Sequence, residues 1–521
     1  MNPLFTSRLL LLTVVLNFIS KSDFSLSLPM TSSEYLKIRS QLIDENESRR
    51  LGSHLVLSSS ELFVNNIFMK EKKTLIESSR LNKTVFFPTE SFYKSKRLID
   101  ESYLFELIHK MPKGAALHTH DLSMVSLDWI IHNATYRENV YMCIWKQSYL
   151  FKVFKTQPLE TDCHWKLVSK ERQNSKDVQA FDMALRNNLS LVSADPFLSF
   201  QDNQAAWLRF GRYFRQLYDL NGKVYDREYC VKLVKEVSDK FVQHFPDFSG
   251  MKIIFSGIRF QNVTTILNEI KDVMALHKKY PDVMAGYDLS GNEALYNPFS
   301  YYSEALLYPS QQDPPYHLPY FLHAGETNWQ GTETGYNLID ALLLNATRVG
   351  HAYALSKHPH LMKLYKERDI PLEVQPLSNQ VLRLVSDFRN HPMASLIASN
   401  YSIVISCDDR TTMDSAPLSH DFYIVFIAMS SDKADLTLLK QLAINSIRFS
   451  TLNNVQKVKA MKLWQIKWNT FITDLQKMPY IRSTSTTKVV HSKNSSTPLH
   501  WPSWAFISLV IAIWYHSGLK V

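Results

Sequence analysis

Short apolar runs alternate with helical stretches from residue 111 onward, and this alternation limits the folds open to the chain. Each run ends in polar or Gly-containing residues, and helical stretches such as TTILNEIKDVMALHKKY separate several of them. Strands that alternate with helices form a parallel sheet, and seven such units predict an α/β fold of the TIM-like (β/α)8 type. The runs are GAALHTHD, KIIFSGIRF, VMAGYDLSG, YFLHAGE, RVGHAYAL, PLEVQPLSN and SIVISCDD.

The barrel pattern has two irregularities. Residues from about 127 to 195 interrupt it after the first run, and we interpret them as an inserted subdomain. No convincing strand stands between this insert and KIIFSGIRF, where a complete barrel needs its second strand. We therefore predict a barrel over residues 111–480 that lacks its second strand, preceded by a helical region at 26–110.

The N-terminus has the pattern of a secretory signal peptide, which we assign to residues 1–25. Arg8 precedes the twelve-residue apolar run LLLLTVVLNFIS, and small and polar residues follow it. In the oxidising compartment that secretion implies, Cys143 and Cys163 could close a local loop by a disulfide. The sequons agree with secretion and begin at Asn46, Asn82, Asn133, Asn188, Asn262, Asn345, Asn400 and Asn494.

The C-terminal residues 481–521 combine a polar stretch, expected to be a disordered linker, with the apolar run WAFISLVIAIWY. Twelve apolar residues are few for a membrane span. The small residues from Asn494 to Ser496, a short spacer and the apolar tail are similar to a GPI-attachment signal, which would give membrane attachment at the cell surface. The alternative is a tail that packs on the domain or anchors weakly.

Three histidines and one aspartate at strand ends predict a metal site. His118 and His120 are two apart on a predicted strand, so both imidazoles point to the same face. A lone histidine on a strand is usually a satisfied core residue. Adding His323 and Asp408, each at the end of another run, makes three nitrogen ligands and one oxygen ligand with room for water, which fits one catalytic zinc ion.

We predict catalytic roles for three more polar residues at strand ends. Glu326 can hold a proton and deliver it to a substrate ring nitrogen. His351 can take a proton from the metal-activated water or orient that water, and Asp409 can hydrogen-bond the water or the departing group. Buried charges are rare unless paired or ligated, so core packing explains the whole set poorly.

The net charge of +9 and the pI near 9.0 suit glycosaminoglycans or acidic surfaces as partners. No dense Lys/Arg block with interleaved aromatic residues is present, so we expect no nucleic-acid partner.

The chain resembles the adenosine deaminase-related growth factors, the secreted adenosine deaminase type 2 group. The resemblance rests on MPKGAALHTHD, HAGETNWQGT, RVGHAYALSKHP, LEVQPLSNQVLRLVSDFRNHP and VISCDD. It implies a barrel of the metal-dependent hydrolase superfamily with one zinc ion. It also implies a homodimer made through N-terminal helices, and a receptor-binding role for the inserted subdomain.

The same resemblance assigns site residues. His118, His120, His323 and Asp408 would bind zinc, Glu326 would protonate the purine ring, and His351 and Asp409 would position the attacking hydroxide. Gly291 would meet the purine through its backbone, and Asp121 and Trp207 are further candidates for ribose or pocket contacts.

Several positions depart from the family pattern. Ala352 stands where glycine is usual, and its methyl group would crowd His351 if the position needs a positive φ. Arg410 replaces a usual proline and could pair with Asp409. Gln375 replaces a usual cysteine, and Ser290 and Asn292 alter the motif around Gly291. Residues 208–250 are several dozen positions shorter than in the family, and the missing portion includes the second barrel strand.

Two functions compete on this sequence. The first is a secreted, zinc-dependent adenosine deaminase that converts adenosine or 2′-deoxyadenosine to the inosine product and ammonia, with growth-factor-like activity. The second is an extracellular ligand of the same family with weak or absent catalysis. A third hypothesis, another amidohydrolase or an AMP deaminase, is disfavoured by the signal peptide.

Overall fold

The computed structural model describes residues 31–81, 83, 85–145, 148–156, 158, 163–193, 195–218, 220, 227–477 and 508–514. The predicted signal peptide lies outside these residues. The chain divides into two compact units, residues 1–48 and residues 49–521. Helix α2 (Ser32–Ser48) is the described part of the first unit, and none of its residues is buried. No helix among the described residues is both long enough and apolar enough to cross a bilayer.

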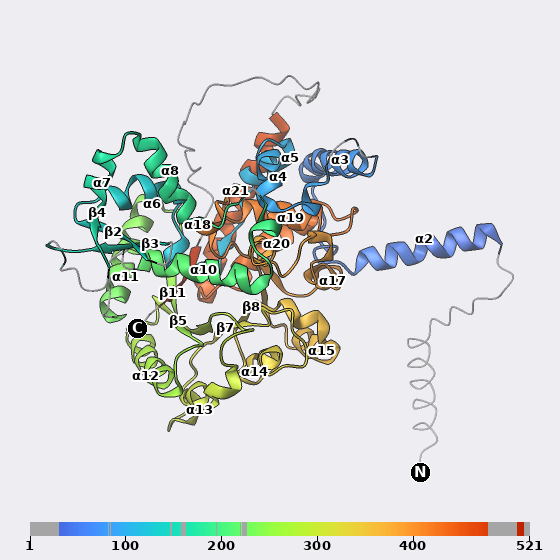
Figure 1. Ribbon diagram of the computed structural model, residues 1–521. Coiled ribbons are helices and arrows are strands. Elements are labelled where there is room, and N and C mark those ends of the chain that lie inside the picture. Colours follow the sequence, from blue (N-terminus) through green and yellow to red (C-terminus); the bar gives the residue numbers. More distant parts are fainter. Residues whose placement is uncertain are drawn as a thin grey trace, which may run out of the picture. The chain divides into compact units, whose positions relative to one another are not determined.

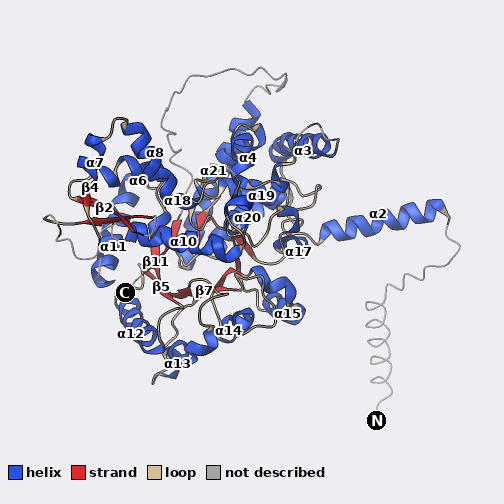
Figure 2. Ribbon diagram, in the orientation of Figure 1, coloured by secondary structure: helices blue, strands red, loops and turns tan. Residues whose placement is uncertain are grey.

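A closed ring of eight parallel strands forms the centre of the second unit in the described chain (Figures 1 and 2). One four-stranded sheet has the order β1-β11-β5-β6 and the other has the order β10-β9-β8-β7. Two parallel bridges join them, Tyr287 to Tyr320 and Thr119 to Asp408. The predicted TIM-like barrel is therefore confirmed. Its strands are β1 (Ala115–Ala116), β11 (Ser508–Trp514), β5 (Met251–Ile258), β6 (Met284–Ser290), β7 (Phe321–Ala324), β8 (Arg348–His351), β9 (Leu372–Val374) and β10 (Ile403–Ile405).

The second position of the barrel is filled from the far end of the sequence. Between the insert and β5 the described residues form helices, α10 (Asn203–Tyr218) and α11 (Arg227–His244), and no strand, as predicted. Strand β11, from the C-terminal apolar run, lies between β1 and β5 instead and runs parallel to both. The barrel as a whole therefore does not lack its second strand, because a distant segment replaces it.

Helices cover the outside of the barrel, as Figure 2 shows. The helices after β5 follow the alternation seen in the sequence, and α3, α4 and α5 precede the first strand. Their bounds are α12 (Val263–Lys279), α13 (Ser303–Leu307), α14 (Asn337–Leu343), α15 (Pro359–Glu367), α16 (Pro376–Val381), α17 (Met393–Ala398), α18 (Arg410–Met413), α19 (Ser419–Ile427), α20 (Leu436–Arg448), α21 (Asn454–Lys477), α3 (Ser59–Arg80), α4 (Phe92–Asp100) and α5 (Tyr103–Lys110).

The N-terminal helix α3 is tied to the C-terminal helices by polar and aromatic contacts. Ser58 caps the helix, and the Glu61 side chain bonds back to the backbone N–H of Ser58. The same carboxylate accepts hydrogen bonds from Lys440 and from the indole of Trp468. Deeper in the interface, Phe68 packs edge-on against two rings of α19 and α21. This packing makes the predicted N-terminal helical region part of the barrel unit from residue 49 on.

The insert forms its own small layer of three antiparallel strands and three helices. Arg172 is its buried centre and donates to Asp182 and to Thr135. The predicted disulfide between Cys143 and Cys163 is present. The elements are β2 (Val140–Trp145), β3 (Ser148–Val153), β4 (Lys166–Leu167), α6 (Leu127–His132), α7 (Val168–Asn174) and α8 (Val178–Asn188), followed by α9 (Pro196–Ser199).

Candidate metal centre

Five side chains from the carboxyl ends of four strands meet inside the barrel. His118 and His120 follow β1, His323 lies in β7, His351 ends β8, and Asp408 follows β10. Each is at most 5% exposed. Potential ligand atoms lie within 4.8 Å of one another in overlapping groups: His118, His120 and Asp408; His118, His323 and His351; and Glu326, His351 and Asp408. The structure thus brings together all four predicted zinc ligands.

Two of these ligands face each other in a way that suits a cation. His118 Nε2 lies 3.5 Å from Asp408 Oδ1, and both atoms are buried without a hydrogen-bond partner in the described chain. Burial alone would lower the pKa of His118, but Asp408 and Glu373 outweigh it and hold this pKa well above its usual value. A divalent ion between the two atoms would satisfy both, and this is the donor set that zinc prefers.

Each predicted histidine ligand has a carboxylate on its other ring nitrogen. Such a partner fixes the ring orientation and leaves Nε2 as the ligand atom. The pairs are His118 Nδ1 with Glu373 Oε2 at 2.7 Å, His120 Nδ1 with Asp409 Oδ2 at 2.9 Å, and His323 Nδ1 with Asp288 Oδ2 at 2.7 Å. Burial would raise the pKa of Asp288, but His323 and its backbone N–H lower this pKa to about 2. The sequence analysis identified Asp409 but missed Glu373 and Asp288.

A buried arginine holds the first of these carboxylates. Arg348 donates from Nε to Glu373 Oε1, the oxygen that does not bond to His118. Its other nitrogens donate to the carbonyls of Leu117 and Phe449 at 3.1 and 3.2 Å. Arg348 therefore ties β8, β9 and the end of β1 together directly beneath the metal site.

A second buried pair supports the loop after β7. Arg259 donates to Glu293 Oε1 at 3.0 Å, and Glu293 Oε2 accepts from the backbone N–H of Gly325 at 2.9 Å. Gly325 has φ +79°, and an added Cβ would lie 3.0 Å from Leu338, so only glycine fits this turn. The turn places Glu326 beside the metal ligands.

Glu326 has the properties of an acid. Its side chain is buried, and burial together with the charges of Asp408 and Glu293 holds its pKa well above the usual value. Its Oε1 lies 3.4 Å from His351 Nδ1. A raised pKa favours the protonated form of a carboxyl group, which can donate its proton to a substrate atom.

A chain of hydrogen bonds fixes the orientation of His351. The backbone N–H of Met393 donates to His391 Nδ1, so neutral His391 carries its proton on Nε2 and donates it to Asn379 Oδ1. The Asn379 amide nitrogen is then left to donate to His351 Nδ1 at 3.3 Å. Burial holds the pKa of His351 well below its usual value, so its ring is neutral with the proton on Nε2. That nitrogen lies 3.9 Å from Asp408 Oδ2, beside the ligands.

The predicted crowding at Ala352 has a structural basis. Ala352 has φ +46° and ψ +26°, in the left-handed region, and it is fully buried. His351 before it also has a positive φ of 61°. The backbone thus keeps the conformation that glycine would favour, at the residue next to a catalytic candidate.

Arg410 has a different electrostatic environment from the one predicted. The Asp409 carboxylate pairs with His120, and burial and the neighbouring Asp408 raise the pKa of Asp409. Burial lowers the pKa of Arg410, and the nearby Asp414 carboxylate opposes this shift. Asp409 therefore contacts one of the predicted metal ligands, His120, through Oδ2.

The predicted substrate contacts lie around the same end of the barrel. Gly291 follows β6 with φ +110°, three residues after Asp288. Asp121 begins the short 3-10 turn that follows His120, and its Oδ1 accepts from Leu122 N. Trp207 is half-buried on α10, and Phe214 on the same helix lies 6.4 Å from the His120 ring. These positions are compatible with a pocket between β6, α10 and the metal site.

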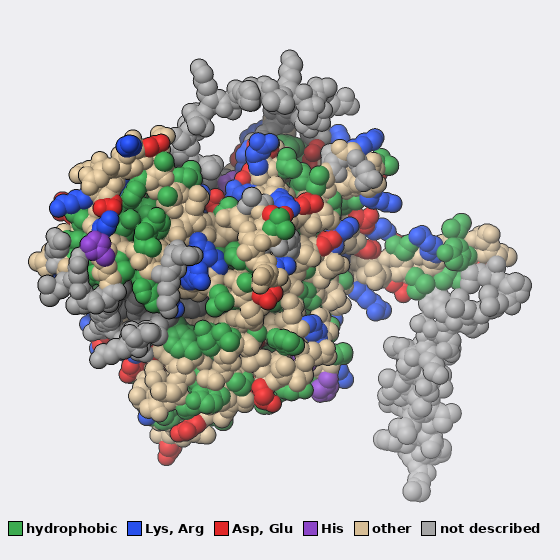
Figure 3. All heavy atoms as spheres, in the orientation of Figure 1, with side chains coloured by type: hydrophobic (Ala, Val, Ile, Leu, Met, Phe, Trp, Pro, Cys, Tyr) green, Lys and Arg blue, Asp and Glu red, His purple; other side chains and the backbone are tan. Residues whose placement is uncertain are grey.

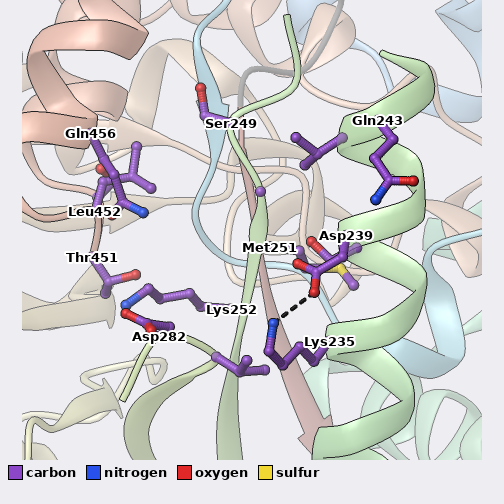
Figure 4. A pocket seen from close by; sticks show the side chains of 15 residues that line it. Lys235, Asp239, Gln243, Ser249, Met251, Lys252, Asp282, Thr451, Leu452 and Gln456 are labelled. Atoms are coloured by element: carbon purple, nitrogen blue, oxygen red, sulfur yellow. Dashed lines mark hydrogen bonds and ion pairs between the residues drawn. The ribbon is translucent and has the colours of Figure 1, made fainter. Parts of the chain in front are cut away.

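A cavity of about 450 Å³ lies at the opposite, amino end of the barrel (Figure 4). It lies between α11, the start of β5 and residues 450–456. Lys235 and Asp239 form an ion pair at its wall. None of the predicted site residues lines it.

Comparisons with known proteins agree with the predicted family. The family model described as "Adenosine deaminase" matches residues 226–463, and "Adenosine/AMP deaminase N-terminal" matches residues 10–108. Adenosine deaminase 2 of Homo sapiens is 38% identical over 479 residues, covering 84% of this chain and 93% of the relative. Adenosine deaminase 2-A of Danio rerio is 37% identical over 475 residues, covering 83% and 93%. A solved bacterial amidohydrolase with bound Zn aligns with a TM-score of 0.46 at 18% identity, covering 72% of this chain and 94% of its own.

Proposed function

The chain belongs to the adenosine deaminase family, and from that premise we propose that it is a secreted, zinc-dependent enzyme that hydrolyses adenosine and 2′-deoxyadenosine to the inosine product and ammonia. The observation that carries the proposal is the opposed pair of unpartnered ligand atoms, His118 Nε2 and Asp408 Oδ1, beside the buried carboxyl group of Glu326. A metal-dependent hydrolase of purine nucleosides needs both features in one site.

The ligand set fits a single zinc ion held by His118, His120, His323 and Asp408. When bound, zinc supplies Lewis acidity, which makes a nucleophile available from water near neutral pH. The carboxylates on the three histidines accept from Nδ1–H and fix the orientation of the imidazoles, which leaves Nε2 facing the metal site.

The reaction then depends on the chain's own acid and bases. Glu326 donates its proton to a ring nitrogen of the purine, which makes the neighbouring amino-bearing carbon more electrophilic. A hydroxyl group adds to this carbon, with His351 Nε2 and Asp409 positioned to orient it. The hydroxyl proton passes to the amino group, the C–N bond breaks and ammonia leaves, and the carbon keeps the oxygen as the carbonyl group of the inosine product.

The amino group of the substrate is exchanged for oxygen without a redox step, so no further cofactor is required. Burial of the site excludes bulk water and strengthens each of these electrostatic contacts. Gly291, Asp121 and Trp207 are proposed to contact the purine and ribose.

The same proposal includes homodimer formation through the N-terminal region, a cell-surface receptor and a glycosaminoglycan partner. Helix α2 supports dimerisation, because Tyr35 and Leu42 stay exposed on a helix without a buried residue. On the face shown in Figure 3, lysine and arginine side chains are scattered among acidic and apolar ones. An acidic polysaccharide would meet dispersed charge on that face.

Ala352 favours the second candidate, an extracellular ligand of the family with weak catalysis. A left-handed alanine beside His351 stores strain of about 1–2 kcal/mol. If this strain displaces the imidazole from the water that it should orient, metal binding survives and turnover falls.

The deciding experiment measures ammonia release from adenosine, 2′-deoxyadenosine and AMP by purified secreted protein, together with its zinc content. We expect one zinc per chain, turnover of the two nucleosides, and a loss of about 10²–10⁴-fold in kcat for Glu326→Gln. Glu333→Gln, at an exposed glutamate, serves as the control and should keep parental turnover. Zinc-loaded protein without turnover would establish the second candidate, and preference for AMP would establish a nucleotide deaminase.

A further inference from the structure

Strand β11, which completes the barrel, lies near the C-terminus, outside the region in which strands and helices alternate. Strand β11 is separated from its two neighbours in the sheet by the whole of the barrel sequence. Figure 1 labels it beside β5, in the second position of the ring. Its residues SLVIAIW contain no charge, as in strands of parallel sheets that are covered on both faces.

We propose that this C-terminal segment is an integral part of the metal centre, so that zinc binding depends on residues far from every ligand. The slot between β1 and β5 is then a binding surface for one uncharged, parallel β-strand, and residues 508–514 of the chain itself are its occupant.

The first support is the position of β1. This strand has two residues, and both pair with β11, Ala115 with Ser508 and Ala116 with Leu509. The segment is also held by the bridge from Thr119 to Asp408, by the bond from Ala115 N–H to Ser446 Oγ and by Arg348, which donates to the Leu117 carbonyl. His118 follows Ala116 by two residues, so the pairing with β11 contributes to the position from which the first ligand projects.

The neighbouring turn gives a second contact near the same ligands. Strand β11 contacts the 3-10 turn Asp121–Ser123, which begins directly after His120. The stretch that carries two of the four proposed ligands is therefore flanked by β11 at both ends.

The third support lies on the other side of the slot. Strand β11 pairs with β5 from Leu509 with Met251 to Trp514 with Ser256. The hydroxyl of Ser256 donates to Asp288 Oδ2 at 2.9 Å, and the same oxygen bonds His323 Nδ1 at 2.7 Å. The pairing along β5 thus ends at Ser256, whose hydroxyl bonds to Asp288, the carboxylate that contacts His323.

Loss of β11 would leave two open strand edges inside the molecule. Buried backbone N–H and C=O groups need partners, so β1 and β5 would have to close on each other or admit water. Either change moves His118 relative to His323, whose ring centroids lie 4.5 Å apart. The apolar run also cannot serve as a removable GPI-type signal while it forms this strand, which favours the packing alternative for the tail.

The test uses the full chain with a protease recognition sequence introduced between residues 484 and 494, cleaved after purification. The proposal predicts that the released C-terminal fragment stays bound through gel filtration, and that zinc stays with the complex. Zinc affinity is measured by competition with a chromophoric chelator, so the result does not depend on deaminase activity. A fragment that separates and leaves a body with parental zinc affinity and parental Tm would overturn the proposal.

Two truncations form a matched pair. A chain that ends at His516 keeps β11 and should bind zinc as the parent does, whereas a chain that ends at Lys477 should lose at least tenfold in affinity. Because the shorter chain could fail to fold, a peptide of residues 503–516 is added to it during refolding, and we expect recovery of zinc binding. Parental affinity in the shorter chain without the peptide, or no recovery with it, would contradict the inference.

Two point variants at Ile511 distinguish the effect of strand pairing from the effect of an apolar side chain. Ile511→Pro removes a backbone donor at the centre of a strand that pairs on both sides, and it should lower zinc affinity at least tenfold. Ile511→Val keeps a β-branched apolar residue and should stay within twofold of the parent. Equal affinities for the two variants would refute the role of the strand.

Discussion

Replacing Glu373 by glutamine tests whether the carboxylate behind His118 controls the metal site. Glu373 accepts two bonds through two different oxygens, one from His118 Nδ1 and one from Arg348 Nε. Glutamine has the same shape but only one carbonyl oxygen. One of the two donors must therefore face an amide N–H, and the buried Arg348 loses its counter-charge.

The size of the effect follows from the burial of the network. Glu373 and Arg348 are at most 2% exposed. Removing one partner of a buried ion pair lowers the free energy of unfolding by about 3–5 kcal/mol. Mutation of a group that orients a metal-binding histidine weakens metal binding about 10–100-fold, which corresponds to about 1.4–2.7 kcal/mol. We expect both losses in Glu373→Gln.

Zinc affinity is measured by chelator competition and stability by urea unfolding of the zinc-free protein. Glu269→Gln is the matched control, since Glu269 is also buried but accepts from Tyr287 and pairs with Arg227 instead of a ligand. It should change zinc affinity less than threefold. Parental zinc affinity in Glu373→Gln, or an equal loss in both variants, would refute the reasoning.

Three further predictions concern strain, pH and the insert. Ala352→Gly should stay within about 0.5 kcal/mol of parental stability, because relief of about 1 kcal/mol of left-handed strain offsets the chain entropy of glycine, whereas Ala352→Val should lose about 2 kcal/mol or more by urea unfolding. Burial lowers the pKa of His391 to about 3, below its usual 6.5. Its neutral form therefore stabilises the fold fully above pH 6.5, and this contribution falls as the pH drops towards 3. The parent should lose about 2 kcal/mol more than His391→Leu between pH 7 and 5, and parallel stability curves would contradict this. Cys143→Ser should lower the stability of the insert by about 3 kcal/mol through its opened loop and leave zinc affinity unchanged, as proteolysis of residues 127–195 and chelator competition can show.

The convergence of the four proposed metal ligands could be predicted from the sequence because their positions follow from local rules. His118 and His120 share a face of one strand, and His323 and Asp408 end other strands whose carboxyl termini meet at one end of a barrel. Parallel strands place such residues together whatever the details of packing. The position of Glu326 beside this cluster could be predicted for the same reason, since it closely follows the strand that carries His323.

The groups that orient the ligands could not be predicted in this way. Glu373, Asp288 and Arg348 lie within or beside apolar strands, where their side chains meet the histidines only through the register of neighbouring strands. The role of Asn379 depends on a backbone N–H at Met393 and on the ring of His391. Such contacts join distant residues and leave no periodic pattern.

The predicted pairing of Arg410 with Asp409 shows the same limit. Adjacent residues of opposite charge suggest an ion pair, but the Asp409 carboxylate lies 2.9 Å from Nδ1 of the buried His120.

The second barrel strand could not be placed for a related reason. An uncharged run near the C-terminus is equally suited to a membrane signal or to a buried strand, and only the open slot between β1 and β5 distinguishes them.

The position of β11 also sets the order of events during biosynthesis. Ribosomes add about 5–20 residues per second, so roughly 20–80 s separate the synthesis of Ala115 from that of Ser508, its partner in the sheet. Nascent chains of this protein must pass that interval with an open, aggregation-prone barrel, and native contacts of such high sequence separation form slowly. The barrel can thus close only after Ser508 has been synthesised, and a chaperone that shields the edges of β1 and β5 would raise the yield of folded protein.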